Sequence, residues 1–237
     1  MFLGAGVMLR ALGDLPLFRF GGDSDYGQKH EDVELNVLAQ VINDSTWKRK
    51  IDVLLAILLI VILSPALLII ALGIVLDSRG PVFFRQERYG KDREVFYVFK
   101  FRTMCAAESA GTFTQARRGD TRLTRLGWVL RHTSLDELPQ LLNVVKGDMS
   151  LVGPRPHAVP MDDVFGTILP GYSDRHLVRP GITGLAQVCG YRGPTDTFNA
   201  ISERLRHDRA YIQRWSIWLD LKILARTPFA LIHKNAL

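Results

Sequence analysis

The chain has 237 residues, 47% of them hydrophobic, and a formal net charge of +6. This size suits one soluble domain plus one membrane element, and a mild basic excess favours anionic lipid headgroups and phosphorylated substrates as partners. Scattered basic residues disfavour nucleic acid as a partner, and two cysteines without metal-site spacing exclude a disulfide framework and indicate a reduced, cytosol-facing domain.

The first 45 residues are predicted to be an N-terminal extension that is partly flexible. Residues 1–20 are apolar in part but are interrupted by glycine, arginine and proline, so they lack the pattern of a signal peptide. Residues 21–30 are polar and are expected to be flexible. Spaced apolar residues from Val33 to Ile42 predict a short amphipathic helix that leads to the membrane.

Residues 46–79 are predicted to be a membrane element, because Ile51 to Leu76 is almost wholly apolar. As a straight helix this stretch would reach about 39 Å, enough for a hydrocarbon core of about 30 Å. Ser64 and Pro65 interrupt it, since proline removes a backbone donor and a serine hydroxyl can satisfy a freed backbone group. Basic residues, which collect on the cytoplasmic side, flank both ends. These features favour a re-entrant helix broken at Ser64-Pro65 over a kinked helix that spans the membrane.

Residues 80–237 are predicted to form a cytosolic domain that is mainly α-helical with a small β-hairpin. Alternating residues around a turn at residues 89–92 predict the two strands of the hairpin, Val82 to Arg85 and Val95 to Phe101. Three segments have helical character, and two rich in glycine and proline are expected to be loops. The helical segments are Leu123 to Arg131, Leu135 to Val145 and Ile201 to Gln213, and the loops are Gly147 to Pro156 and Arg179 to Gly184.

A tryptophan-rich amphipathic stretch runs from Trp215 to Leu224 near the end of the chain. In a membrane protein such a stretch can lie as an interfacial helix at the lipid surface, as the amphipathic segment before the membrane element can. The alternative is ordinary packing in the core, and the sequence leaves both open.

Asp136 and Glu137 are adjacent carboxylates at the start of a leucine-rich segment, in the run Ser134-Leu135-Asp136-Glu137-Leu138-Pro139. One interpretation is helix capping, either by a capping box of Ser134 with Glu137 or by Asp136 as N-cap with Pro139 in the first turn. The other is chemical, because paired carboxylates beside a phosphate site suit a metal ligand or a nucleophile.

Arg155 lies between Pro154 and Pro156, which hold its backbone extended. A guanidinium presented in this way can bind phosphate with two hydrogen bonds, although a solvated surface arginine is the alternative. Further charged residues are candidates of unknown placement, and the histidines at 132, 157 and 176 are taken as structural or exposed. The further candidates are Lys100, Arg102, Arg131, Arg179 and Asp220, the last of which would need a partner if buried.

These features occur together and in order over residues 46–227, and in this the chain resembles the small bacterial sugar transferases, the monotopic polyprenyl-phosphate phosphoglycosyl transferases. The resemblance rests on long motifs in register, and only the first 45 residues fall outside it. The motifs are Lys48-Arg49-Lys50-Ile51-Asp52, Ser64-Pro65, Gly80-Pro81-Val82-Phe83-Phe84-Arg85-Gln86, Phe99-Lys100-Phe101-Arg102-Thr103-Met104, Ser134-Leu135-Asp136-Glu137-Leu138-Pro139-Gln140, Gly147-Asp148-Met149-Ser150-Leu151-Val152-Gly153-Pro154-Arg155-Pro156 and Arg179-Pro180-Gly181-Ile182-Thr183-Gly184.

The resemblance implies that residues 80–237 are a catalytic domain that moves a sugar 1-phosphate from a UDP-sugar to polyprenyl phosphate and releases UMP. It implies that Asp136 is the nucleophile of a covalent phosphosugar intermediate and that Glu137 is the ligand of a Mg²⁺ cofactor. It implies substrate-binding roles for Arg155 and, more weakly, for Arg131, Lys100, Arg102, Arg179 and Asp220. Membrane lipids are further expected partners, and a homo-oligomer is compatible with the sequence. The expected location is the bacterial inner membrane, with the catalytic domain facing the cytosol.

The run from Gly190 to Thr197, with Pro156-His157, is similar to the subgroup that handles hexose 1-phosphate from UDP-glucose or UDP-galactose, although Pro194 stands where that subgroup has glutamate. That subgroup starts the repeat units of exopolysaccharides and capsules. A function of another class is a membrane-tethered module that binds phospholipid or a partner without catalysis. The intact Asp136, Glu137 and Arg155 argue against such a module.

Overall fold

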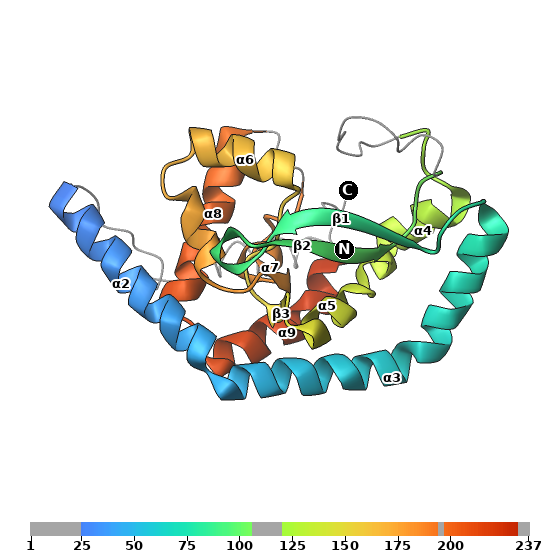
Figure 1. The fold of residues 1–237 in the computed structure, drawn as a ribbon, viewed down its shortest axis with the longest axis horizontal. Coiled ribbons are helices and arrows are strands. Elements are labelled where there is room, and N and C mark those ends of the chain that lie inside the picture. The colour runs from blue at the N-terminus through green and yellow to red at the C-terminus, as the bar shows by residue number, and fades with distance from the viewer. Residues whose placement is uncertain (1–24, 106–119, 194–196, 232–237) are drawn as a thin grey trace, which may run out of the picture.

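The computed structural model describes residues 25–105, 120–193 and 197–231. Within these ranges the chain is mainly α-helical, and its strands form a two-stranded antiparallel sheet and a two-stranded parallel sheet (Figure 1). The predicted fold class is therefore confirmed at this level. Most of the predicted N-terminal extension lies outside the described residues.

Helix α2 (Asp25–Asp44) is longer than the short helix that the sequence predicts. Residues 25–30, which were expected to be flexible, form its first turns. On the side that faces the domain, Leu35, Ala39 and Ile42 are buried in the main hydrophobic core. The spacing of these residues is that of one helix face, so the amphipathic pattern explains how α2 packs.

Helix α3 (Thr46–Asp77) follows after a single residue, Ser45, whose side chain accepts a hydrogen bond from the backbone N–H of Lys48 (3.2 Å) and caps the new helix. It is the one helix in the described part of the chain that is long and apolar enough to cross a membrane. The most apolar part has a mean hydropathy of 3.3, and only 6% of it is buried inside the protein. By length, composition and exposure, α3 is therefore a candidate membrane segment.

Ser64 and Pro65 lie within α3, and Figure 1 shows the helix bending partway along so that its second part turns toward the hairpin. Pro65 has no N–H, which leaves the carbonyl of Val61, four residues earlier, without its helical donor. The Ser64 hydroxyl donates to that carbonyl at 2.8 Å. The serine thus satisfies the group that the proline frees, as the sequence predicted.

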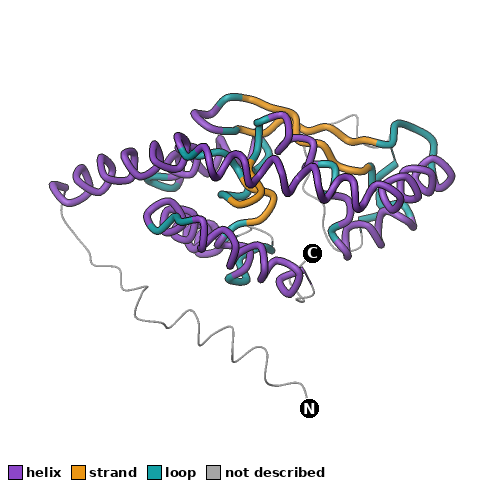
Figure 2. Tube along the Cα trace, turned by 90° about the horizontal axis from the view of Figure 1, so that it is seen from below, coloured by secondary structure: helices purple, strands orange, loops and turns teal. Residues whose placement is uncertain are grey.

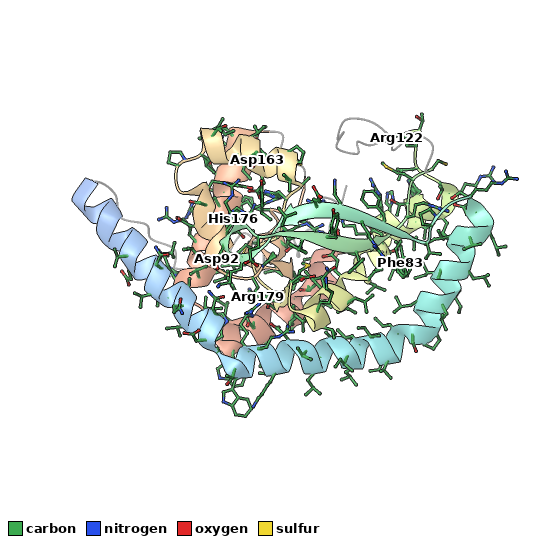
Figure 3. The ribbon with its side chains drawn as sticks, viewed as in Figure 1. Phe83, Asp92, Arg122, Asp163, His176 and Arg179 are labelled. Atoms are coloured by element: carbon green, nitrogen blue, oxygen red, sulfur yellow. The ribbon has the colours of Figure 1, made fainter. Side chains whose placement is uncertain are left out.

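The β-hairpin consists of β1 (Phe83–Tyr89) and β2 (Val95–Phe101), which pair antiparallel. The second strand has the predicted bounds, and the first extends four residues further than predicted. The turn contains a short 3₁₀ segment, η2 (Lys91–Arg93). Figure 3 places Asp92 of this turn near His176, on the side of the domain where η2 contacts the 3₁₀ segment η5 (Tyr172–Leu177).

The segment after the hairpin forms α4 (Arg125–Thr133), the 3₁₀ turn η4 (Leu135–Glu137) and α5 (Gln140–Lys146). The helical character predicted for Leu135 to Val145 is confirmed, but the segment is divided into a 3₁₀ turn and an α-helix. Pro139 cannot donate a backbone hydrogen bond, so the chain forms a tight turn before it and a regular helix after it. The two carboxylates therefore lie in a turn between two helices rather than in a continuous helix.

The two segments expected to be loops each contain a short strand. β3 (Ser150–Val152) pairs in parallel with β4 (Gly181–Thr183), which corrects the loop prediction. Glycine is required at the crossing, because a Cβ atom on Gly181 would lie 2.1 Å from the backbone nitrogen of Gly153. This pairing fixes the segment that leads from β3 to Arg155.

The remaining helices are α6 (Val159–Ile168), α7 (Leu185–Val188), α8 (Phe198–Gln213) and α9 (Ile217–Leu231). Helix α8 ends where the sequence predicts and begins three residues earlier. Helix α9 has two faces, since Ile223 is buried in the main core while the Trp218 side chain is 73% exposed. The tryptophan-rich stretch thus packs in the core on one face and leaves its other face free.

Both halves of α3 pack against the same domain. In the first half Ala56 is fully buried in the main core. In the second half Ile74 is buried against Phe101 of β2 and Leu130 of α4. Figure 2, seen from below, shows α2 and α3 running along the length of the molecule. The domain therefore packs against both halves of α3.

Candidate active site

Asp136 and Glu137 lie in η4, between α4 and α5. Ser134 takes a left-handed conformation (φ 59°) that ends α4, and its side chain caps neither η4 nor α5. Its hydroxyl instead accepts a hydrogen bond from Arg192 (2.6 Å). Both capping predictions are therefore wrong, because Asp136 lies inside η4 and Pro139 holds the N-cap position of α5.

Glu137 is held by two cations that come from different elements. Lys100, near the end of β2, donates from Nζ to Oε1 at 2.7 Å. Arg155, in the segment after β3, makes a two-pronged contact, with Nη1 donating to Oε2 at 2.9 Å and Nη2 donating to Oε1. Charge-assisted and bidentate hydrogen bonds of this kind fix a side chain strongly.

Asp136 lies in a different environment from its neighbour. It is 8% exposed, and among the described residues its carboxylate accepts no hydrogen bond, although Lys100, Arg131 and Arg155 act on it electrostatically. Successive residues of a 3₁₀ turn point about 120° apart, which directs the two carboxylates into different surroundings. The Glu137 carboxylate is thus fixed by hydrogen bonds, whereas no hydrogen bond from a described residue occupies the lone pairs of the Asp136 carboxylate.

The pKa values of Asp136 and Glu137 differ for the same reason. Burial raises the pKa of Asp136 to about 6, with a smaller contribution from the charge of Glu137, while Lys100 and Arg131 oppose the rise. Burial would also raise the pKa of Glu137, but Arg155 and Lys100 together outweigh it and hold the pKa of Glu137 well below its usual range. Glu137 is therefore a permanent anion, and Asp136 titrates just below neutral pH.

Arg131 is the third cation beside Asp136. It lies in the last turn of α4, and its Nε donates to the hydroxyl of Thr103 at 2.9 Å. Burial lowers the pKa of Arg131, while the charge of Asp136 raises it. The sequence candidates that the structure brings together are thus Asp136, Glu137, Lys100, Arg131 and Arg155.

Two further candidates lie elsewhere and hold backbone instead. Arg102 donates from Nη2 to the carbonyl (2.6 Å) and the hydroxyl (3.0 Å) of Ser78 and to the carbonyl of Ile74 (3.3 Å), at the end of α3. Arg179 donates from Nε to the carbonyl of Gly147 (3.1 Å), just after α5, on the side of the domain near α3 (Figure 3). Both guanidiniums bind backbone carbonyls at or just beyond the C-terminal end of a helix.

Asp220 also lies away from the two catalytic candidates. Its carboxylate accepts hydrogen bonds from Lys48 Nζ (2.8 Å), from the Tyr211 hydroxyl (2.9 Å) and from the Trp215 indole (3.1 Å). A buried carboxylate of this kind needs partners, and these three provide them. The cluster joins the start of α3 to α8 and α9.

Sequence reasoning missed two arginines near the site. Arg192 donates from Nη2 to Ser134, two residues before Asp136, while its Nη1 is buried and has no hydrogen-bond partner among the described residues. Arg88 of β1 donates from Nη1 to the carbonyl of Pro156 at 3.1 Å, and burial lowers its pKa to about 10, with Arg155 acting in the same direction. The Gly-Tyr-Arg-Gly run around Arg192 is the one sequence signal that points to either.

This arrangement suits attack by a carboxylate on a phosphate-bearing substrate. A carboxylate is a competent nucleophile when the electrophile is activated, and Asp136 is the carboxylate that is free to act. The repulsion between two anions would be offset by the fixed cations Lys100, Arg131 and Arg155, which are already oriented before a substrate arrives.

Comparison with known proteins agrees with this geometry. Residues 43–234 match the family model described as bacterial sugar transferase. The chain belongs to the bacterial sugar transferase family. The match includes α3, the hairpin and the whole of the carboxylate site, so the family assignment covers the candidate membrane helix as well as the domain.

Three relatives within the family are informative. Proteins named UDP-glucose:undecaprenyl-phosphate glucose-1-phosphate transferase, from Caulobacter vibrioides and Klebsiella pneumoniae, are 52% and 49% identical over 80% of this chain. The chain covers 71% of the first and 41% of the second. A Rhizobium leguminosarum protein named exopolysaccharide production protein PSS is 43% identical over 78% of the chain, which covers 94% of it. The chain thus spans about two fifths of the Klebsiella relative and nearly the full length of the Rhizobium one.

Proposed function

We propose that the chain transfers a hexose 1-phosphate, with glucose the leading candidate, from a UDP-sugar to undecaprenyl phosphate and releases UMP. This reaction would start the assembly of a repeat unit of an exopolysaccharide, capsule or O-antigen. Two relatives are named for this transfer with UDP-glucose. The observation that carries the proposal is the division between Asp136, buried without hydrogen bonds, and Glu137, fixed by Lys100 and Arg155.

In the first step, a carboxylate oxygen of Asp136 attacks the phosphorus next to the sugar. The new P–O bond replaces the bond to the bridging oxygen, and UMP leaves with the electron pair. In the second step, a phosphate oxygen of the lipid carrier attacks the same phosphorus, and the bond to Asp136 breaks. The aspartate returns as a free carboxylate, so one site can accept a soluble donor and a lipid acceptor in turn.

Mg²⁺ is the cofactor we infer, with Glu137 as its main protein ligand and Asp136 beside it. The residues fit such an ion, because carboxylate oxygens are its preferred ligands and, among the described residues, Glu137 Oε2 accepts a hydrogen bond from Arg155 alone. No cluster of three or more metal-ligating side chains is found in the described part of the chain, so substrate phosphates would complete the coordination. When bound, Mg²⁺ supplies positive charge that offsets the charge of the diphosphate. Removing divalent ions with EDTA should abolish UMP release and adding Mg²⁺ should restore it, and full activity in EDTA would exclude the metal.

The decisive test of the function replaces Asp136 by asparagine. Asp136→Asn keeps the size of the side chain and removes the nucleophile, so we expect UMP release from UDP-glucose to fall at least 10³-fold, as loss of a catalytic group commonly causes. The measurement is UMP release in membranes or nanodiscs supplied with undecaprenyl phosphate. Turnover within a few-fold of the unchanged protein would contradict the assignment.

The same variant carries its own control for folding. The pKa of Asp136 is raised in the folded protein, from 3.8 to about 6. The folded protein therefore loses stability as the pH rises from 3.8 to about 6, and the loss is complete above that range. At pH 7.5 the penalty is on the order of 3 kcal/mol, and Asp136→Asn removes it. The variant should therefore unfold at a higher temperature while losing activity, a combination that general damage to the fold does not produce.

We infer further that α3 enters the inner membrane from the cytosolic side and returns to it. At the start of the helix, Arg49 donates to the carbonyls of Val144 (2.6 Å) and Val145 (3.0 Å), and at its end Arg102 holds Ser78. A straight helix of 32 residues would hold its ends about 48 Å apart. Contact of both ends with one domain, together with basic residues on both flanks, supports a re-entrant helix with the domain at the cytosolic surface.

A further inference from the structure

The backbone around each of two arginines near Asp136 is held by another, more deeply buried arginine. Arg175 of η5 donates from Nη2 to the carbonyl of Arg155. Arg204 of α8 donates from Nε to the carbonyl of Tyr191 (3.1 Å) and from Nη2 to the carbonyl of Gly193 (2.7 Å), and these carbonyls flank Arg192. Each supporting arginine therefore acts on the backbone next to an active-site guanidinium and makes no contact with the carboxylates themselves.

The two supporting arginines meet on opposite edges of one imidazole. Nη1 of Arg175 lies 2.6 Å from Nδ1 of His157, and Nη1 of Arg204 lies 2.8 Å from its Nε2. All three side chains are buried, and Asp208 pairs with Arg175 at 3.0 Å. A continuous chain of contacts thus runs from Arg155 through His157 to the two carbonyls beside Arg192.

A neutral His157 can accept a hydrogen bond from only one of the two arginines, so with Arg204 on Nε2 the 2.6 Å approach of Arg175 Nη1 to Nδ1 is a contact and not a hydrogen bond. Its Nε2 accepts from Arg204, and its Nδ1–H donates to the hydroxyl oxygen of Tyr172 at 2.6 Å, an oxygen that also accepts from Arg175 at 2.7 Å. The Tyr172 hydroxyl in turn donates to Asp162. Burial, with Arg175 and Arg204 acting in the same direction, holds the pKa of His157 well below its usual range, so the imidazole remains an acceptor for Arg204.

Stability alone is a poor reason for this cluster. Burying guanidiniums is costly unless each is fully paired, and apolar side chains of similar volume commonly stabilise a core better. Arg204 has no carboxylate at hydrogen-bonding distance among the described residues, and burial and Arg175 lower its pKa to about 10. What the cluster provides, and apolar packing would not, is a fixed separation between two backbone segments.

We propose that His157, Arg175 and Arg204 are positioning residues that set the separation of Arg155 and Arg192 on either side of the donor's diphosphate. The inference rests on the proposed function, because it assigns Arg155 and Arg192 to the phosphates of a nucleotide diphosphate sugar. The buried, unpartnered Nη1 of Arg192 is the donor that this separation would bring to the substrate.

The test is a double-mutant cycle on UMP release from UDP-glucose, run with enzyme in excess so that large losses remain measurable. Arg204→Lys keeps the charge but cannot reach both carbonyls and the imidazole. Alone, it should lower kcat/KM about tenfold or more, mainly through KM. In an Arg192→Ala background it should change kcat/KM less than twofold, because the residue through which it acts is gone.

Three further variants extend the cycle, two at His157 and one control at Arg206. His157→Gln retains an amide oxygen that can accept from Arg204, whereas His157→Leu retains no acceptor, so the glutamine variant should keep several times more activity than the leucine variant. Arg206→Lys is the matched control, since Arg206 lies on the exposed side of the same helix and pairs with Glu203. It should leave both KM and kcat unchanged.

Different outcomes would contradict the proposed function and the positioning role. If the unchanged protein releases no UMP from UDP-glucose or UDP-galactose, the proposed function fails. If it is active but Arg204→Lys lowers kcat/KM equally with and without Arg192, the positioning role is overturned. A fall in the unfolding temperature with an unchanged KM in the Arg204→Lys or His157→Gln variant would also overturn it, because the cluster would then serve stability alone.

Discussion

At the scale of single residues, adjacent positions in one turn have acquired opposite properties. Glu137 is ionised and immobilised by Lys100 and Arg155, while Asp136 is buried, unpaired and less acidic than an ordinary aspartate. A pair of carboxylates whose environments push their pKa values apart can divide two roles between them. In the function that we propose, the division separates a nucleophile, Asp136, from a ligand or orienting group, Glu137.

The raised pKa of Asp136 predicts an acid limit to activity. Only the ionised carboxylate can attack, so kcat/KM for UDP-glucose should fall about tenfold per pH unit below pH 6. The measurement is a pH profile of UMP release under subsaturating donor. Lys100→Gln removes the largest charge that lowers this pKa, so the acid limit should move to higher pH. A flat profile between pH 5 and 7.5 in the unchanged protein would contradict the prediction.

The sequence predicted the carboxylate pair and Arg155 because these residues occur in local motifs. It left the placement of Arg102 open. β2 ends at Phe101, and the residue beyond the strand turns to the end of α3 instead of following Lys100. Arg192 was missed because it reaches the site from a loop that only the fold brings near Ser134. Local patterns identify chemistry within one segment, whereas contacts between distant loops depend on packing.

At the scale of elements, α3 is bound to the parts of the domain that carry the site. Arg49 of α3 holds the last turn of α5, which begins just after η4, and Arg102 holds the end of α3 against the strand that carries Lys100. At both places a guanidinium donates to backbone carbonyls at the C-terminal end of a helix. The membrane helix and the active site therefore share their supporting contacts.

Loss of the Arg102 contacts should loosen this arrangement. Arg102→Gln removes a charged donor from the carbonyls of Ile74 and Ser78, and we expect a loss of about 1–3 kcal/mol of stability, seen as a fall of several degrees in the unfolding temperature in nanodiscs. Arg85→Gln is the control, because Arg85 is exposed on the neighbouring strand and only stacks on Phe99. Equal unfolding temperatures for the two variants would show that the contacts at Ser78 contribute little.

The sequence predicted elements with a clear period and missed those without one. The hairpin and α8 follow two-residue and helical periodicities that can be recognised in one segment. The parallel pair of β3 and β4 has strands of only three residues, joined across a long crossover, so neither strand has enough residues to show a period. The sequence reflects this pairing only in the glycines at 153 and 181, which the close approach of the two backbones requires.

At the scale of the whole molecule, one domain contacts both ends of its membrane helix. The charge pattern predicts the same arrangement, since basic residues flank both ends of the apolar segment. The fold adds the physical contacts at Arg49 and Arg102 and the bend at Pro65. The helical period alone could not decide between a helix that returns and one that spans, because a proline within an apolar helix is also compatible with a kinked helix that spans the membrane.

Labelling of single cysteines tests the re-entrant arrangement. In a background without Cys105 and Cys189, Glu34→Cys and Glu94→Cys place exposed thiols before and after α3. A membrane-impermeant maleimide added outside intact cells or spheroplasts should label neither, and both should react after permeabilisation. A cysteine introduced into a known external loop of another membrane protein is the positive control. Labelling of one thiol from outside would mean that the helix spans the membrane.

The bend of α3 also frees the anchor from a constraint that spanning helices obey. A spanning helix must match the hydrophobic thickness of its bilayer, and it does so by tilting or by deforming the lipid around it. In the re-entrant arrangement that we propose, α3 has no second surface to reach, so a thicker or thinner bilayer imposes no such mismatch. The depth of the domain is then set by the cytosolic headgroups alone, and its contact with the phosphate of a lipid carrier stays constant as acyl-chain length varies.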